Sequence, residues 1–173
     1  RTQRHQLAFA LMTDDKEKAD RYFKDAVDTL EYLTTVYKEN PNYTYDLADT
    51  LSMASTQLPS IKSPFHARQQ ISRAQKLCEK LTTKFPKVSA YRVLSATCHR
   101  KMAIVEAFEG NERQAMNELN KAVETLRQLV KDNPGQSSFQ LQITLAKKQF
   151  ADSVLQIGCQ QDSEKKIHDA KSL

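Results

Sequence analysis

The sequence is poor in the two residue types that end or bend secondary structure. Its 173 residues include only three glycines and five prolines. A β-sheet domain of this length needs many turns, which are built largely from these residues, so their scarcity argues against a sheet architecture. No apolar run approaches the roughly eighteen residues that a transmembrane helix requires. The sequence therefore predicts a helical protein without membrane insertion.

Cysteine is also scarce, and its spacing excludes two common uses. Cys78, Cys98 and Cys159 are odd in number and form no CxxC pair, which argues against a disulfide framework and against a zinc site. The sequence has neither an initiator methionine nor a signal-peptide pattern. We therefore expect a fragment of a longer protein that works in a reducing compartment, the cytoplasm.

The charged residues are numerous but mixed in sign. The formal net charge is +5, and lysine and arginine are interleaved with aspartate and glutamate along the chain. This pattern is typical of solvated helix faces and not of a concentrated nucleic-acid footprint. The apolar share of 39% suffices for one continuous core.

Pairs of alanines spaced by seven residues recur at an interval of 48 residues. The pairs are Ala19 with Ala26, Ala67 with Ala74, and Ala115 with Ala122. Larger residues repeat at the same interval, in the columns Phe23, Ile71, Leu119; Leu30, Cys78, Leu126; Leu33, Leu81, Leu129; and Tyr43, Tyr91, Phe139. The apolar residues within one unit follow the three- and four-residue spacing of an amphipathic helix. The sequence therefore predicts a helical repeat.

Two kinds of stop separate the predicted helices. Asn40-Pro41, Phe85-Pro86 and Asn133-Pro134 end one helix and open the next, because the residue before proline is pushed out of the α region. A second stop falls in the middle of each unit, with Gly110 and Gly158 at the same position of consecutive units. The predicted helices are 1–12, 15–39, 43–58, 65–85, 87–108, 112–132 and 136–157, and a further one starts at 161. They group into the units 1–40, 41–85, 86–133 and 134–173 of a single domain.

One combination of small residues resembles a known repeat family. The combination is Ala103, Gly110, Ala115, Leu119 and Ala122. It is similar to the tetratricopeptide pattern, in a variant with a longer second helix, and such elongated units resemble repeat arrays beside kinase domains in bacterial multidomain serine/threonine kinases. The resemblance implies a right-handed superhelix of antiparallel hairpins, an α-solenoid of about 7–8 helices. It also implies that partners bind the concave face, which the first helix of each hairpin lines.

A stripe of basic and amide residues is the candidate binding site. In peptide-binding members of the family such residues hold a partner's C-terminal carboxylate. The corresponding columns contain Arg4, Arg100, Lys148 and the neighbouring His5, Lys101, Gln149. These side chains would make charge-assisted hydrogen bonds to an acidic peptide or carboxylate. The alternative is that they are ordinary solvated charges.

No combination of residues indicates catalysis, a metal or a cofactor. The four histidines lack metal-ligand spacing, and adjacent helical residues such as Cys98 and His99 point in different directions. Asp14-Asp15 is best interpreted as a helix cap. The sequence therefore predicts a non-catalytic protein-interaction scaffold, possible partners being a protein or peptide.

Other functions remain open from the sequence. The chain could be a structural spacer, or a module that self-associates through the open ends of its array. Nucleic-acid binding through the basic stripe is disfavoured by Asp46, Asp49 and Asp152 on the same helices. Tyr43, Tyr91 and Phe139 fit packing between units better than stacking on a ligand.

Overall fold

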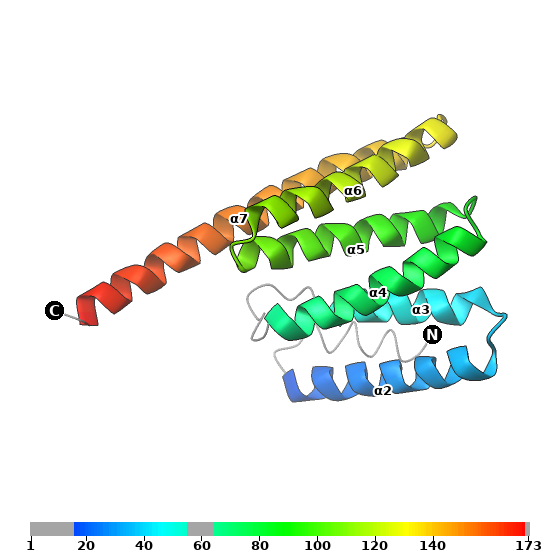
Figure 1. Ribbon diagram of the computed structural model, residues 1–173, viewed down its shortest axis with the longest axis horizontal. Coiled ribbons are helices and arrows are strands. Elements are labelled where there is room, and N and C mark those ends of the chain that lie inside the picture. Colours follow the sequence, from blue (N-terminus) through cyan, green and yellow to red (C-terminus); the bar gives the residue numbers. More distant parts are fainter. Residues whose placement is uncertain (1–15, 55–63, 172–173) are drawn as a thin grey trace.

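Six α-helices form the part of the chain that the computed structural model describes, residues 16–54 and 64–171 (Figure 1). They are α2 (Lys16–Val36), α3 (Pro41–Ala54), α4 (Pro64–Lys84), α5 (Ser89–Phe108), α6 (Glu112–Asp132) and α7 (Ser137–Lys171). These residues contain no strand, so over the described ranges the fold is all-α, as the scarcity of turn residues predicted.

The helices start at regular intervals. α2, α4 and α6 each have 21 residues, and their first residues Lys16, Pro64 and Glu112 are 48 positions apart. α3, α5 and α7 likewise begin at Pro41, Ser89 and Ser137, again 48 positions apart. These starts lie close to the predicted ones because local residues set them. At α3, for example, the Asn40 side chain accepts a hydrogen bond of 3.1 Å from the Asn42 backbone N–H.

The turn between α5 and α6 closes at Gly110. This glycine has φ +78°, in the left-handed region that other residues rarely adopt. The Gly110 N–H donates to the Ala107 carbonyl at 3.1 Å, and the Asn111 N–H donates to the Glu106 carbonyl at 2.8 Å. These two bonds form a Schellman motif, which satisfies the last carbonyls of α5. The predicted stop at Gly110 is therefore a complete helix end.

The predicted helix count was too high. The expected helix 1–12 lies outside the described residues. The expected stop at Gly158 was wrong, because α7 continues through it to Lys171. Glycine inside a helix costs only about 1 kcal/mol, so the residue alone does not end one. The predicted helices 136–157 and 161 onward are thus one helix of 35 residues.

Consecutive helices run antiparallel, and each packs against the next (Figure 1). α3 also packs against α5, and α5 against α7, so α5 lies at the centre of the described helices. The seven-spaced alanines are buried in this packing, including Ala26, Ala74 and Ala122. Small side chains at these positions let the neighbouring helix approach closely, which is the role that the sequence assigned to them.

Two groups of buried side chains form the core. The first joins α2 to α5 and consists of Val27, Leu47, Ala48, Leu51, Ala67, Ile71, Ala74, Cys78, Leu94, Cys98, Met102 and Val105. The second joins α5 to α7 and consists of Ala96, Ala103, Leu119, Ala122, Val123, Leu126, Leu129, Phe139, Ile143 and Ala146. Both groups draw on α5, so this helix connects them into one body.

The aromatic column contributes to packing. Tyr91 and Phe139 are buried. The Tyr91 ring lies 5.6 Å from that of Tyr45 and 6.0 Å from that of Phe85, measured between centroids. Tyr43, which is half-buried, lies 5.6 Å from Tyr37 in the same way. These spacings are those of favourable aromatic pairs, and they support the packing interpretation over ligand stacking.

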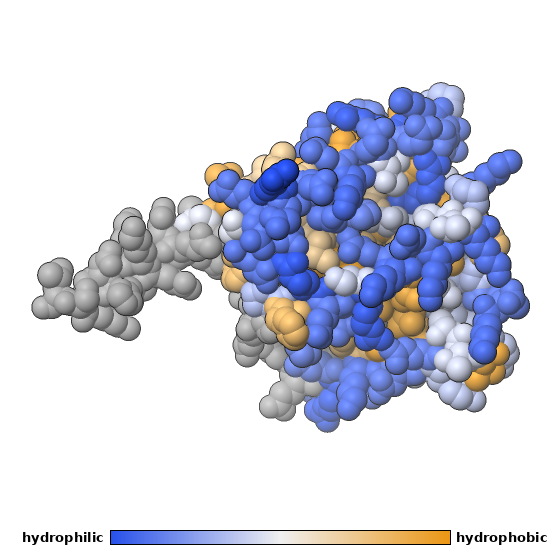
Figure 2. Space-filling view, in the orientation of Figure 1, coloured by the Kyte–Doolittle hydropathy of each residue, from blue (hydrophilic) through white to orange (hydrophobic). Residues whose placement is uncertain are grey.

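The molecular surface in the view of Figure 2 is mostly hydrophilic, and hydrophobic residues are exposed in small separate patches. Over the residues described, no helix combines the length and apolar character needed to cross a bilayer.

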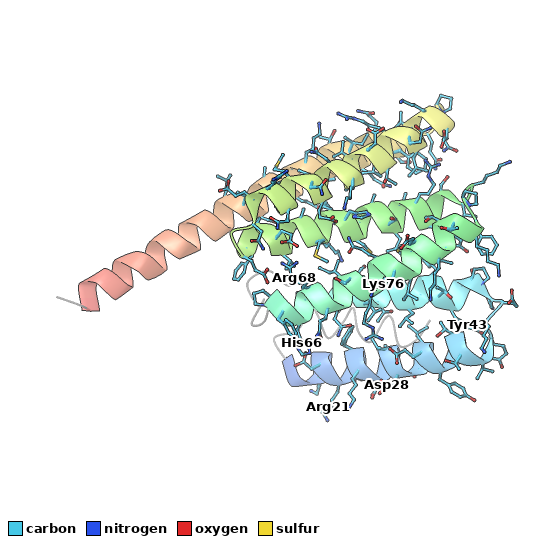
Figure 3. All side chains as sticks on the ribbon, viewed as in Figure 1. Arg21, Asp28, Tyr43, His66, Arg68 and Lys76 are labelled. Carbon is cyan, nitrogen blue, oxygen red and sulfur yellow. The ribbon has the colours of Figure 1, made fainter. Side chains whose placement is uncertain are left out.

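A charged cluster ties the start of α4 to the end of α5. The Arg68 guanidinium donates to the carboxylates of Glu106 and Glu109, and Figure 3 shows it reaching from α4 toward α5. The Asn111 side-chain amide donates to Glu106 at 3.0 Å. Glu106 is only 6% exposed, and its hydrogen bond from Arg68 is the main reason that its pKa lies below the ordinary value. Arg68 therefore compensates a buried negative charge.

Replacement of Arg68 by methionine is expected to lower the free energy of unfolding at pH 7 by about 1–2 kcal/mol, because it leaves Glu106 buried with fewer donors. The lowered pKa of Glu106 stabilises the fold above the unfolded value near 4.5, and this contribution is lost as the pH falls through the folded pKa. The difference between the proteins should therefore shrink in acid. Urea denaturation at pH 7 and pH 3 measures it.

Arg73→Met is the matched control. Arg73 also forms an ion pair between helices, with Glu31 of α2, but both side chains are more than two-fifths exposed. Exposed pairs contribute about 0–1 kcal/mol. Equal losses for the two variants would contradict the role assigned to Glu106 burial.

Candidate functional site

The six predicted binding residues fall in three different environments. Arg4 and His5 lie outside the described residues. Lys148 and Gln149 are exposed on α7, and Arg100 is half-buried on α5. Lys101, its neighbour, is buried with 8% of its surface exposed. The described members of the predicted stripe thus do not share one degree of exposure.

Lys101 connects two helices from the interior. Its Nζ donates a hydrogen bond of 2.5 Å to the backbone carbonyl of Ser52, in the last turn of α3. A cation at the carboxyl end of a helix interacts favourably with the helix dipole. Burial is the main cause, and the charge of Arg100 a second one, of a pKa lowered to about 8. Lys101 therefore holds α5 against α3 and is not placed to contact a partner.

Arg100 keeps part of its surface exposed. Burial lowers the pKa of its guanidinium. Ala96 and Ala103, one turn away on either side, are buried in the second core group, so this face of α5 is turned toward α6 and α7. No carboxylate within the described ranges forms an ion pair or hydrogen bond with Arg100. It is a partly desolvated cation without a counter-ion there.

Lys148 occupies the position of α7 that Arg100 occupies in α5, 48 residues earlier. Because α5 and α7 pack directly against each other, the two cations lie on adjacent helices. Asp152 follows Lys148 by one turn and is also exposed, so the α7 part of the stripe carries both signs. Arg100 is thus the position with the least local compensation.

A polar network that sequence reasoning missed joins three helices. The Glu118 carboxylate of α6 accepts hydrogen bonds from Gln75 of α4 at 3.0 Å and from Lys121 at 2.6 Å, and lies 2.7 Å from Nδ1 of His99 in α5. Burial raises the pKa of Glu118, but the hydrogen bonds from His99 and Lys121 outweigh it, and the net pKa is lowered. Positions 75, 99 and 118 share no spacing rule, so only the packing of the helices shows the network.

Cys78 and Cys98 face each other in the core. Both are free and buried, and their Sγ atoms are 3.9 Å apart, too far for a disulfide bond. The contact with Cys98 and burial raise the pKa of the Cys78 thiol. The pair packs as small apolar residues, as the sequence predicted.

Metal chemistry has no visible basis in the described part of the chain, where no three histidine, cysteine or acidic side chains gather in a way that could hold an ion. No family model, curated protein or solved structure matches the chain.

Proposed function

We propose that the chain is a tetratricopeptide-like scaffold that binds an acidic peptide segment, or the C-terminal carboxylate of a partner, on the face formed by α3, α5 and α7. In this proposal the antiparallel helices form hairpins of a right-handed superhelix. The 48-residue interval between helix starts supports it, as do the contacts of α3 with α5 and of α5 with α7. These three helices then form one continuous face.

Arg100 is the observation that carries the proposal. A guanidinium that is partly removed from water loses hydration, and a carboxylate partner offsets this loss with two parallel hydrogen bonds. Within the described residues the chain itself supplies no such carboxylate to Arg100. A partner's carboxylate would therefore gain a charge-assisted contact without breaking an ion pair of the scaffold.

Lys148 and Lys101 have supporting roles in this proposal. Lys148 is exposed on the adjacent helix and would attract an acidic segment from solution, an effect that salt screens. Lys101 stays bound to the Ser52 carbonyl and adds positive potential beside Arg100. The recognition is electrostatic at its centre, and no residue in it acts as a catalyst.

The test uses a library of fluorescent decapeptides with acidic C-terminal sequences, each made with a free carboxylate and as the amide. We expect members that bind with micromolar affinity, and Arg100→Gln to weaken their binding about tenfold, because a charge-assisted hydrogen bond contributes about 1.5 kcal/mol. Fluorescence anisotropy measures the affinities.

Arg113→Gln serves as the control, because Arg113 is an exposed arginine of α6, away from α3, α5 and α7 in the chain's helix order. It removes the same charge and should leave the affinity within about twofold, a difference of about 0.4 kcal/mol. If no library member binds, or if both variants weaken binding equally, the proposed site is wrong.

A further inference from the structure

One side of α7 is apolar and exposed, although the same side of the preceding helices is covered. Ala151 and Leu155 correspond, 48 residues earlier, to Ala103 and Ala107 of α5. Ala103 is fully buried in the second core group, whose members include α6 residues. Ala151 is exposed, and Leu155 is 69% exposed. The interface between α5 and α6 thus continues onto α7 as an open face.

The sequence after Gly158 has the pattern of a helix that would cover this face. Ile167 and Ala170 occupy the positions of Leu119 and Ala122 in α6. Both of those residues are buried in the second core group. Gly158 itself occupies the position of Gly110, where α5 turns into α6. The segment 159–171 therefore resembles the second helix of a hairpin.

The course of α7 keeps this segment away from its own helix. α7 runs on through Gly158, and its C-terminal part projects beyond the other helices (Figure 1). A straight helix cannot fold back on itself, so residues 159–171 lie in line with Ala151 and Leu155 and not beside them. The open face and the segment that fits it belong to the same helix but are separated along its axis.

We propose that two copies of the chain exchange these segments. The α7 helices would cross antiparallel about their Gly158 residues, so that segment 159–171 of each copy covers the Ala151–Leu155 face of the other. The spacing fits: Ala103 lies seven residues before Gly110 and Leu119 nine after it, and Ala151 and Ile167 have the same spacing around Gly158. The pairing is two-fold symmetric and closes after two copies.

The reach of the exchanged segment is limited. Thirteen helical residues span about 20 Å, which brings the segment from Gly158 back to about residue 145 of the other copy. Leu141 is 59% exposed on the same helix but lies beyond this reach. It is therefore an exposed apolar residue that the exchange leaves uncovered, and it serves as a control.

Sedimentation equilibrium of the 173-residue chain from about 1 to 200 µM tests the exchange. We expect a monomer–dimer equilibrium, which Ala151→Glu and Ile167→Lys each weaken about tenfold or more, because each places a charge in an apolar contact. Leu141→Glu should leave the equilibrium unchanged. Circular dichroism checks that every variant keeps its helix content.

Mixing the two variants separates reciprocal exchange from other contacts. In a mixed dimer Glu at 151 of one copy meets Lys at 167 of the other, and the second contact keeps its natural residues. The mixture should therefore dimerise more strongly than either variant alone. A monomer at all concentrations, or a mixture that gains nothing, would overturn the proposal. Peptide binding through Arg100 is measured separately, so the two proposals fail independently.

Discussion

Replacement of Ile71 by alanine lowers the free energy of unfolding by about 2–5 kcal/mol in this account. Ile71 is fully buried at the start of the first core group, where α3, α4 and α5 meet. Truncation removes apolar contact area and leaves a cavity that rigid helices on several sides close only in part. Urea denaturation followed by circular dichroism measures the loss.

Leu141→Ala is the matched control for this prediction. Leu141 is also a large aliphatic residue within a helix, but it is 59% exposed. Truncation of an exposed side chain leaves no cavity, so we expect a change within about 0.5 kcal/mol. If Ile71→Ala were as mild as Leu141→Ala, the packing of α4 between α3 and α5 would be wrong.

Replacement of Lys101 by methionine makes stability less dependent on pH above neutrality. The pKa of Lys101 is lowered from 10.5 to about 8, so below about pH 8 the fold holds a buried charge that it disfavours. Between pH 8 and 10.5 the unfolded chain binds a proton that the folded chain does not bind. The native protein therefore gains stability as the pH rises through this window, by about 3 kcal/mol at most.

Methionine removes the charge but keeps most of the side-chain length. At pH 7 we expect Lys101→Met to be more stable than the native protein by about 1–2 kcal/mol, since the lost bond to Ser52 offsets part of the gain. By pH 10.5 this advantage should disappear. Denaturation midpoints measured at pH 7, 8, 9 and 10.5 follow the difference, in which other titrating groups cancel.

The exposed Lys148 provides the comparison for Lys101. Lys148→Met removes the same charge from the surface of α7, so its effect on stability should vary little over this pH range. A constant difference between Lys101→Met and the native protein would show that Lys101 reaches water in the folded state.

Local residues explain why the helix positions could be predicted. The asparagine at position 40 caps α3 through its side chain, and Gly110 adopts a conformation that suits glycine, so these boundaries depend on neighbours in the sequence. Gly158 shows the limit of this reasoning. The same residue at the same repeat position lies inside a helix, because a glycine permits a turn without requiring one.

The candidate site was less predictable than the fold. Arg100 and Lys101 are neighbours on α5, and the repeat columns place both in the binding stripe. The helix turns by about 100° between them, and only the packing of α3 shows that Lys101 points into the core. The buried Glu106 and the network around Glu118 likewise depend on contacts between helices, for which one sequence gives no signal.

Hydrogen exchange of the backbone amides, resolved by residue, tests the repeat geometry on which both proposals rest. The account predicts slow exchange within α3, α4, α5 and α6. Fast exchange should interrupt it at residues 37–40, 85–88 and 133–136, at intervals close to 48 residues. Protection that continues through 85–88 or 133–136, or rapid exchange across the whole of α5, would contradict it.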